Sequence, residues 1–368
     1  MKNKKYLEEY ITVLLISFLG VLFSVFLAKP KIPEIMHMLE AKNNLWEAIE
    51  FKKNHIFSNL SQYDPNSGEA KYVFRLTVPL IMKFFQLNVF QMYWVQITLG
   101  FSIFVLWVSI FKEFIHDKKG LILITLCLAS SYYGKAFIID SGTAVNVLSY
   151  FLILFSIKFR NVPVLFCPSL FMLFFNDERG ILAFSIIALF ILFFKKDIEH
   201  KLLTKSFYLL IGSFTICVFI RLLLMLSYGM HLPLGEIGFG IFTNQWKYVH
   251  LGLFSGLVGL SIPFVIQLIN ELSQKKYFFF FSTSFVLIIF IIGTSIVSDM
   301  TKSIAYLTPL FILFMWRMLN SNKDYQLLIY AVLITNILFP TIVVVGDKQF
   351  EFYSFTFDII FKVHSLFV

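Results

Sequence analysis

Long apolar segments recur about eleven times along this chain, and short polar connectors separate them. A bilayer core about 30 Å thick requires roughly 20 apolar residues per helix, and in lipid each backbone group must be paired inside its own helix. The segments are 10–28, 90–111, 120–134, 142–157, 162–176, 180–194, 206–227, 249–269, 277–296, 303–319 and 326–345. A membrane β-barrel would instead show alternating stretches of roughly 10 residues. We therefore expect an all-α fold, a polytopic transmembrane helical bundle of about 11 spans.

The composition agrees with a membrane protein. Hydrophobic residues make up 58% of the chain and charged residues 14%, which is too little polar surface to cover a water-soluble globule of 368 residues. The first apolar segment follows three lysines, as in a signal peptide, but it is too long and lacks a small-residue cleavage site. We interpret it as a retained first helix, and residues 1–368 as one integral membrane domain.

The charges between the segments predict the topology. The Lys and Arg residues behind the net charge of +9 are spread over many connectors, so we exclude a nucleic-acid-binding domain. If the spans alternate, the most basic connectors share one side: Lys2, Lys4, Lys5, Lys112, Lys118, Lys119, Lys158, Arg160, Lys195, Lys196, Lys201, Lys205, Lys275, Lys276, Arg317 and Lys323. The other side carries Lys135, Asp140, Asp177, Glu178, Arg179, Glu236, Asp299, Lys302, Asp347 and Lys348. By the positive-inside rule the N-terminus is cytoplasmic and the C-terminus extracytoplasmic.

The loop 29–89 would lie on the extracytoplasmic side although it is basic. Its length of about 60 residues is where the positive-inside rule loses force. Apolar residues at helical spacing, with Glu and Lys between them, predict an interfacial helix over 33–51. A turn at 63–68 then leads into a short amphipathic helix over 69–80. We expect a long first extracytoplasmic loop that bears amphipathic helices and whose positive charge suits an anionic substrate.

The cysteines and histidines argue against several other classes. Cys127, Cys167 and Cys217 lie inside apolar segments, where cysteine behaves as a small hydrophobic residue, so we expect neither a disulfide framework nor a thiolate metal site. The seven histidines form no metalloprotease motif, and the chain has no Gly-rich phosphate-binding loop. We therefore do not expect an ATP-driven pump.

Three consecutive charges, Asp177, Glu178 and Arg179, interrupt two apolar segments on the predicted outer side. One interpretation is structural: Asn176 or Asp177 caps the helix that enters at Gly180, and the acids lie at its positive end. The other is functional, because a cap needs one such residue and three charges at the edge of lipid are costly unless they face a polar cavity. In that case a carboxylate serves as general base and Arg179 holds an anion.

Further charges fall on the same predicted side. Asp299 and Lys302 are three residues apart and meet on one helical face, either as a cap with a snorkelling lysine or as part of a site. Arg221 lies about sixteen residues into its span, roughly 24 Å from the cytoplasmic start, where it either snorkels to headgroups or binds a lipid phosphate.

The first loop contributes a charged cluster of its own, formed by Asp64, Glu69, Lys71 and Arg75. Lys71 and Arg75 are four residues apart and share a helical face, so together they suit a phosphate or pyrophosphate. A solvated amphipathic helix is the structural alternative.

The long first loop, the acids in later outer connectors, and Asp299 with Lys302 ahead of Pro309 resemble bacterial multi-pass glycosyltransferases of the GT-C type. The stretches 64–67 and 74–79 and the 177–179 turn are similar to those of membrane proteins found with surface-polysaccharide genes. GT-C enzymes usually carry an acidic pair soon after the first span, whereas this chain has the single acids Glu34 and Glu40 there.

The resemblance implies a protein of the bacterial inner (cytoplasmic) membrane that takes a sugar from a polyprenyl-phosphate donor to a glycan or lipid-linked acceptor on the outer face. Asp177 or Glu178 is the first choice for the base, then Asp64 or Glu69, and Asp299 belongs to the same catalytic set. The cations expected to bind the departing phosphate are Arg179, Arg221, Lys302, Arg75 and Lys71. Mg²⁺ or Mn²⁺ held by Asp177 and Asp299 is an additional hypothesis that the spacing does not require.

Three other functions remain open. A flippase or transporter of lipid-linked oligosaccharide would use the same cations, but it should show charges near the middle of the membrane and broken helices in corresponding halves. A polysaccharide polymerase would differ by taking an acceptor several sugars long. A non-catalytic membrane scaffold would tolerate loss of the outer acids.

Overall fold

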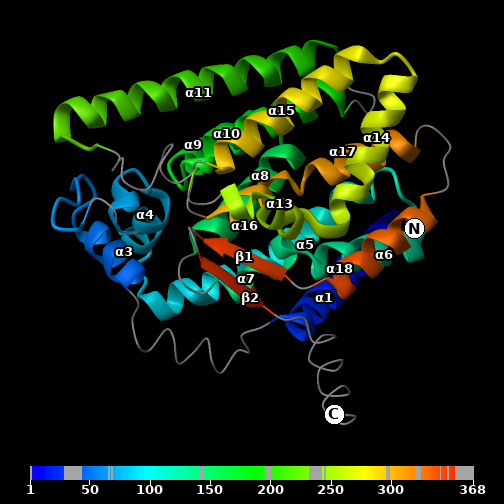
Figure 1. Cartoon of the computed structure of the whole chain (residues 1–368), viewed down its shortest axis with the longest axis horizontal. Helices are drawn as coiled ribbons and strands as arrows, with labels where there is room; N and C mark the ends of the chain where they lie inside the picture. The colour runs from blue at the N-terminus through cyan, green and yellow to red at the C-terminus, as the bar shows by residue number, and fades with distance from the viewer. Residues whose placement is uncertain are drawn as a thin grey trace, which may run out of the picture.

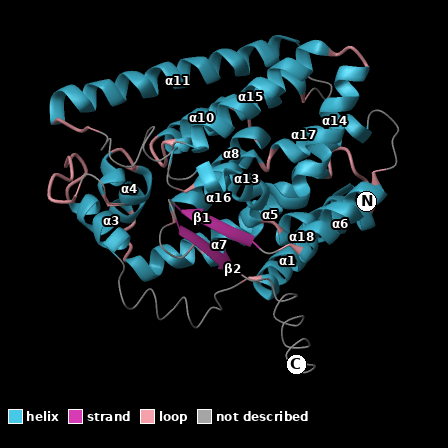
Figure 2. Cartoon of the chain, in the orientation of Figure 1, coloured by secondary structure: helices cyan, strands magenta, loops and turns pink. Residues whose placement is uncertain are grey.

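The computed structural model describes residues 2–28, 44–64, 67, 69–140, 144–194, 200–231, 243, 246–295, 299–319, 325–339, 341–345 and 348–352. Helices dominate this part of the chain (Figures 1 and 2). The first half contains α1 (Lys2–Leu27), α3 (Asn44–Asn54), η1 (Ala70–Val73), α4 (Thr77–Phe84), α5 (Val89–Phe111), α6 (Lys118–Ser130), α7 (Tyr132–Ile139), α8 (Val145–Lys158), α9 (Pro163–Phe174) and α10 (Arg179–Phe193). The second half contains α11 (His200–Tyr228), η3 (Trp246–Tyr248), α13 (Val249–Leu257), η4 (Val258–Leu260), α14 (Ser261–Ser273), α15 (Tyr277–Ser295), α16 (Met300–Ile304), η5 (Ala305–Leu307), α17 (Leu310–Leu319), α18 (Gln326–Leu338), β1 (Thr341–Val345) and β2 (Lys348–Phe352).

The long apolar helices indicate a membrane-embedded protein. Within the described residues, six helical stretches are long and apolar enough to cross a bilayer, and the pair α6–α7, bent by 54°, makes a seventh if it counts as one span. The six are Tyr6–Leu27, Val89–Phe111, Lys205–Tyr228, Val249–Ser273, Tyr277–Ser295 and Met300–Leu319. The apolar helices α8, α9, α10 and α18 have only 10–17 residues. The all-α membrane class is confirmed, and the count of about 11 spans stays a prediction.

The helices differ in how far the rest of the protein encloses them. Figure 1 shows α11 and α15 along one edge and α8 nearer the centre. In the most apolar window of Lys205–Tyr228, protein buries 22% of the residues, against 78% for Met300–Leu319. On α11, large apolar side chains such as Phe219 and Leu226 are exposed, as expected for a face that contacts lipid. The enclosed helices can therefore carry polar groups that a lipid-facing helix could not.

The first loop folds back onto the turn between α9 and α10. The prediction of one helix over 69–80 is wrong, because η1 is interrupted at 74–76 before α4 begins. The backbone N–H groups of Leu76 and Thr77 both donate to the carbonyl of Phe175, at 2.7 and 3.1 Å. Thr77 Oγ1 also donates to the carbonyl of Met172, at 2.7 Å. These long-range bonds replace local helical ones and hold Arg75 beside the turn.

The predicted interfacial helix over 33–51 falls only partly within the described residues. The helix α3 covers the C-terminal part of the 33–51 segment, and residues 33–43 lie outside the described residues. Several other residues named above also lie outside the described residues: Lys195, Lys196, Glu236, Lys323, Asp347, Glu34 and Glu40.

A β-hairpin follows the last helix, so the predicted apolar span 326–345 is wrong at its C-terminal end. The helix α18 ends at Leu338, and β1 pairs antiparallel with β2, with Val343 opposite Phe350. Phe339 is extended, with φ −94° and ψ 132°, the conformation favoured before a proline such as Pro340. The β-branched run that follows favours a strand over a helix.

The hairpin contacts the bundle at α13 and α16 (Figure 2). The backbone N–H of Ile342 donates to Ser255 Oγ at 2.6 Å, and its carbonyl accepts from Thr301 Oγ1 at 3.0 Å. Because α16 also carries Lys302, this contact fixes the hairpin close to charges that are predicted to lie on the outer side.

Two ion pairs join connectors predicted to lie on the cytoplasmic side. Lys112 Nζ lies 3.2 Å from Glu9 Oε2, and Lys158 Nζ lies 2.7 Å from Glu113 Oε1. They place the start of α1, the end of α5 and the end of α8 at one end of the bundle, as alternating spans require.

Candidate functional site

The turn between α9 and α10 is anchored by Asn176, which is fully buried. Its Nδ2 donates to the carbonyl of Val145 at 2.5 Å and to Ser149 Oγ at 2.7 Å, so α8 holds the turn. Next to it, Asp177 Oδ1 accepts the backbone N–H of Arg179 at 3.0 Å. Asp177 therefore accepts the first backbone N–H of α10, whereas Glu178, which directly precedes the helix, makes no side-chain cap hydrogen bond.

Arg179 and Asp177 form a buried ion pair. Arg179 Nε donates to Asp177 Oδ1 at 2.8 Å, and its Nη2 donates to Asp177 Oδ2. The same guanidinium group donates from Nη1 to Ser303 Oγ at 3.2 Å and from Nη2 to Asn146 Oδ1 at 2.7 Å, and it lies over the ring of Tyr306. Arg179 therefore connects α10 to α8 and α16.

The hydrogen bonds continue from Asn146 to a second ion pair. Asn146 Nδ2 donates to Asp140 Oδ2, and Lys302 Nζ lies 3.0 Å from Asp140 Oδ1. Tyr150, on α8, donates its hydroxyl to the carbonyl of Lys302 at 2.7 Å. Asp140 is 5% exposed, so this is an enclosed pair between the end of α7 and α16.

The first loop completes the arrangement through Arg75. Its Nε and Nη2 both lie 2.9 Å from Glu178 Oε2, and Nη2 lies 4.0 Å from Asp177 Oδ1. The guanidinium also lies over the ring of Tyr72. These contacts define one continuous set of charged and polar side chains, here called the ion network: Arg75, Asp140, Asn146, Asp177, Glu178, Arg179 and Lys302.

Other predicted site residues lie around the ion network. Asp299 directly precedes α16, and its charge interacts with those of Lys302 and Lys71. Asp64 is exposed on the first loop, and Glu69 is partly buried ahead of η1. Neither of these two acids belongs to the ion network as defined by its hydrogen bonds. The structure thus brings Arg75 together with the later connectors that are predicted to be extracytoplasmic, and Asp64 and Glu69 are not part of the ion network.

Asp140 and Asn146 were not among the predicted site residues. A single aspartate in a polar connector is ordinary, and an asparagine inside an apolar segment gives little signal by itself. The sequence signal that could have identified them is that both fall within seven residues, on the predicted side where the acids gather.

Neighbouring cations lower the proton affinity of two carboxylates, those of Asp177 and Asp299. Burial by itself would raise the pKa of Asp177, but the guanidinium groups of Arg179 and Arg75 outweigh burial and hold that pKa well below the usual range. Burial likewise opposes the net effect on Asp299, whose pKa is lowered by Lys302 and Lys71. Burial would lower the pKa of Arg75, yet Glu178 and Asp177 raise it. Asp177 therefore stays ionised and is a weak proton acceptor.

Three of the five cations predicted to bind a phosphate already hold carboxylates: Arg75 with Glu178, Arg179 with Asp177 and Lys302 with Asp140. Arg221, on α11, differs. Its guanidinium carbon lies 4.1 Å from the ring centroid of Phe74, and its enclosed Nη2 has no hydrogen-bond partner among the described residues. Its charge interacts with that of Glu178, which places it beside the ion network.

The described residues offer little to a divalent cation. They contain no group of three or more His, Cys, Asp or Glu side chains arranged to hold a metal ion. Both carboxylate oxygens of Asp177 accept hydrogen bonds from Arg179, which leaves poor access for a cation at that residue. Mg²⁺ or Mn²⁺ at Asp177 and Asp299 stays a prediction.

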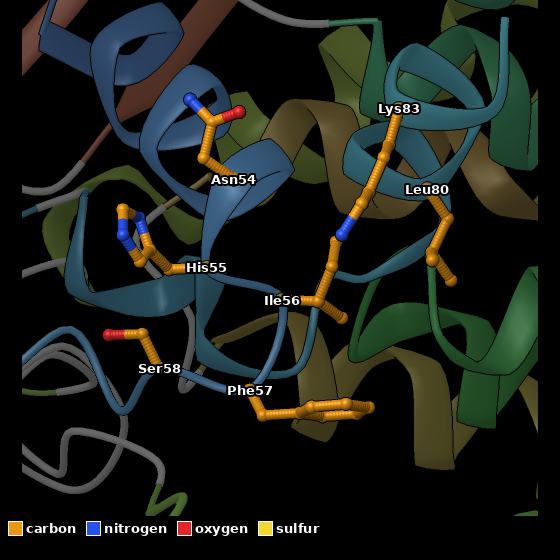
Figure 3. Close-up of a pocket in the computed structure, with 7 residues that line it drawn as sticks. All are labelled: Asn54, His55, Ile56, Phe57, Ser58, Leu80 and Lys83. Atoms are coloured by element: carbon orange, nitrogen blue, oxygen red, sulfur yellow. The ribbon is translucent and has the colours of Figure 1, made fainter.

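Two cavities lie next to each other on the loop side of the site. The first, of about 610 Å³, has polar side chains on its walls: Asn54, His55, Ser58 and Lys83. Figure 3 shows Asn54 and His55 on one side and Lys83 with Leu80 on the other. The second cavity, of about 330 Å³, is an apolar groove between α4, α9 and α11. Phe57 and Leu80 line both cavities.

No known protein family, no curated protein and no solved structure matches this chain.

Proposed function

We propose that this protein is a membrane glycosyltransferase that moves a sugar from a polyprenyl-phosphate donor to a glycan or lipid-linked acceptor. In this proposal it lies in the bacterial inner membrane, with its N-terminus in the cytoplasm and its site on the extracytoplasmic face. The support comes from a set of charges, distant in sequence, that meet at one end of an apolar bundle where uncompensated charge is costly.

The placement of Glu178 carries the proposal. Its side chain is 18% exposed, whereas that of Asp177 is fully enclosed, so Glu178 is the more accessible of the two first-choice bases. Arg75 contacts Oε2 of Glu178, and Oε1 accepts no hydrogen bond from the described residues. A carboxyl group with one oxygen free of hydrogen bonds from the described residues suits a group that accepts a proton from a hydroxyl.

In the proposed sugar transfer, the acidic and basic side chains have separate roles. Glu178 accepts the proton of the acceptor hydroxyl while that oxygen bonds to the anomeric carbon of the donor sugar. The bond between this carbon and the phosphate oxygen breaks, and its electron pair stays on the phosphate. Arg221 and Lys71 stabilise the negative charge that develops there. Asp177 positions Arg179 and Arg75 and does not itself transfer a proton.

Sugar transfer by the purified protein in liposomes tests the proposal. Membrane extracts containing polyprenyl-phosphate sugars provide the donor, and labelled product is measured. We expect Glu178→Gln to lower transfer at least about 100-fold, the usual scale of general-base catalysis, with unchanged helix content. Glu113→Gln, in the ion pair at the opposite end of the bundle, is the control and should retain activity. Full activity of Glu178→Gln would contradict the assigned role.

A flippase or transporter of lipid-linked oligosaccharide is the second candidate, and one observation favours it. The pair α6–α7 is bent by 54° at the break between Ser130 and Tyr132. Broken helices are a feature of carriers. Transbilayer movement of a fluorescent lipid-linked sugar, without any sugar transfer, would favour this function.

A further inference from the structure

The apolar groove adjoins the ion network. Its walls include Leu76, Leu80, Phe171, Phe175, Ile220 and Leu224. Leu76 follows Arg75 in the chain, and Phe175 precedes the 176–179 turn, so the backbone segments that position the site also form the groove. Leu80 is 46% exposed at the rim, whereas Leu224 is 9% exposed within it. The groove therefore begins at the surface and runs inward along α11.

Arg221 lies between the two groove residues of α11, Ile220 and Leu224. A guanidinium N–H that is enclosed without an acceptor loses its hydration and gains nothing in return, so an unpartnered Nη2 points to a missing anionic group. Phe74 covers one face of the guanidinium and leaves its edge for a hydrogen-bond acceptor. An anionic group bound there would lie at the junction between the groove and Glu178.

We propose that this groove binds the isoprenoid units nearest the phosphate of a polyprenyl phosphate and that Arg221 binds the phosphate itself. This inference rests on the proposed function, because it names where the lipid part of the donor binds. The volume of about 330 Å³ is at the small end of single-ligand pockets, roughly 300–1,000 Å³, so it holds a segment of one chain. A diacyl phospholipid would leave its second chain outside.

The two parts of the site recognise two parts of the ligand. The aromatic and branched walls remove the isoprenoid chain from lipid without any polar contact, and the cation selects the phosphate over an uncharged end group. Removing the charge of Arg221 should therefore weaken the binding only of ligands with a phosphate. Filling the groove should weaken the binding of every prenyl lipid.

Binding of undecaprenyl phosphate and of undecaprenol to the full-length protein in neutral-lipid nanodiscs tests this inference. Arg221→Gln should weaken binding of the phosphate about 10-fold and leave binding of the alcohol unchanged. Leu224→Trp should weaken binding of both at least about 10-fold. Leu223→Trp is the matched control, because Leu223 is the neighbouring residue, is 44% exposed and does not line the groove. Unchanged phosphate binding in Arg221→Gln, or equal effects of the two tryptophans, would overturn the proposal.

A second measurement does not depend on how well a variant folds. A photoreactive prenyl phosphate should label the wild-type protein within 76–81, 171–175 and 220–224, and excess phosphatidylglycerol should not remove the label. Labelling elsewhere, or displacement by phosphatidylglycerol at equal concentration, contradicts a polyprenyl-phosphate site. Neither measurement requires sugar transfer. Groove binding in a protein that transfers no sugar defeats only the proposed function, and transfer without groove binding defeats only this inference.

Discussion

Arg75 of the first loop and Glu178 of the α9–α10 turn lie 2.9 Å apart although 103 residues separate them in the chain. The contact depends on two backbone hydrogen bonds from Leu76 and Thr77 to Phe175, which carry the loop against the turn. A loop predicted to lie at the surface thereby becomes part of a largely enclosed site.

The pairing of Arg75 with Glu178 is measurable by a double-mutant cycle. The variants are Arg75→Gln, Glu178→Gln and the double substitution, with unfolding followed in detergent. Because both groups are mostly enclosed and hydrogen-bonded, we expect a coupling free energy of about 1–3 kcal/mol. The pair Lys112–Glu9, which is more exposed, should give about 0–1 kcal/mol in the same cycle. Equal coupling in both pairs would contradict the enclosed geometry.

The stability of the protein should fall only at low pH. The lowered pKa values of Asp177 and Asp299 mean that their stabilising contribution is fully present above the unfolded-state pKa of about 3.9. It is lost progressively as pH falls below that value toward the lower folded-state pKa. Melting temperature in detergent should therefore change little from this source between pH 7 and 5 and fall below about pH 4. Asp177→Asn should reduce that acid dependence, and an unchanged profile would argue against the assignment.

The ion pair between Glu271 and Arg317 should be important for stability. Glu271 is 1% exposed, and Arg317 contacts both of its oxygens, at 2.9 and 2.7 Å. Removing one partner leaves an uncompensated buried charge, so Glu271→Ala should cost about 3–5 kcal/mol of unfolding free energy. Glu113→Ala, which breaks the more exposed pair with Lys158, should cost about 0–1 kcal/mol. Reversible unfolding in mixed micelles measures both.

A methyl group at Gly180 should disturb the site by moving α10 away from α9. A Cβ there would lie 2.2 Å from the carbonyl oxygen of Leu173, and a backbone atom cannot move aside easily. We expect Gly180→Ala to lower both melting temperature and sugar transfer. Gly212→Ala is the control, because no atom lies within 4 Å of its added Cβ, and it should leave stability unchanged or raise it by about 1 kcal/mol. Unchanged melting of both variants would contradict the close helix contact.

Much of the general architecture was predictable from local patterns. Apolar segments of helical length indicated a membrane bundle, and the 177–179 turn stood out because three consecutive charges between such segments are rare without a reason. The prediction of one helical span over 326–345 was wrong at its C-terminal end. Pro340 indicates the end of a helix, but the valines after it are as apolar as a membrane span, so hydrophobicity alone did not separate the two.

The sequence did not predict which side chains of the ion network pair with one another. Asp140 meets Lys302 across 162 residues, and Arg179 meets Asn146 across 33, contacts that no local spacing encodes. The expectation that Lys71 and Arg75 share a helical face also gave way, because the chain turns at 74–76 to reach Phe175.

The sequence by itself determined that the chain forms apolar helices in a membrane, because a backbone in lipid must satisfy its own hydrogen bonds and segment length reveals where it does so. Tertiary structure alone decided which carboxylate each cation holds and that Arg221 Nη2 has no acceptor among the described residues. Ion pairing acts over a few ångströms in three dimensions, and those distances arise only when distant helices pack together.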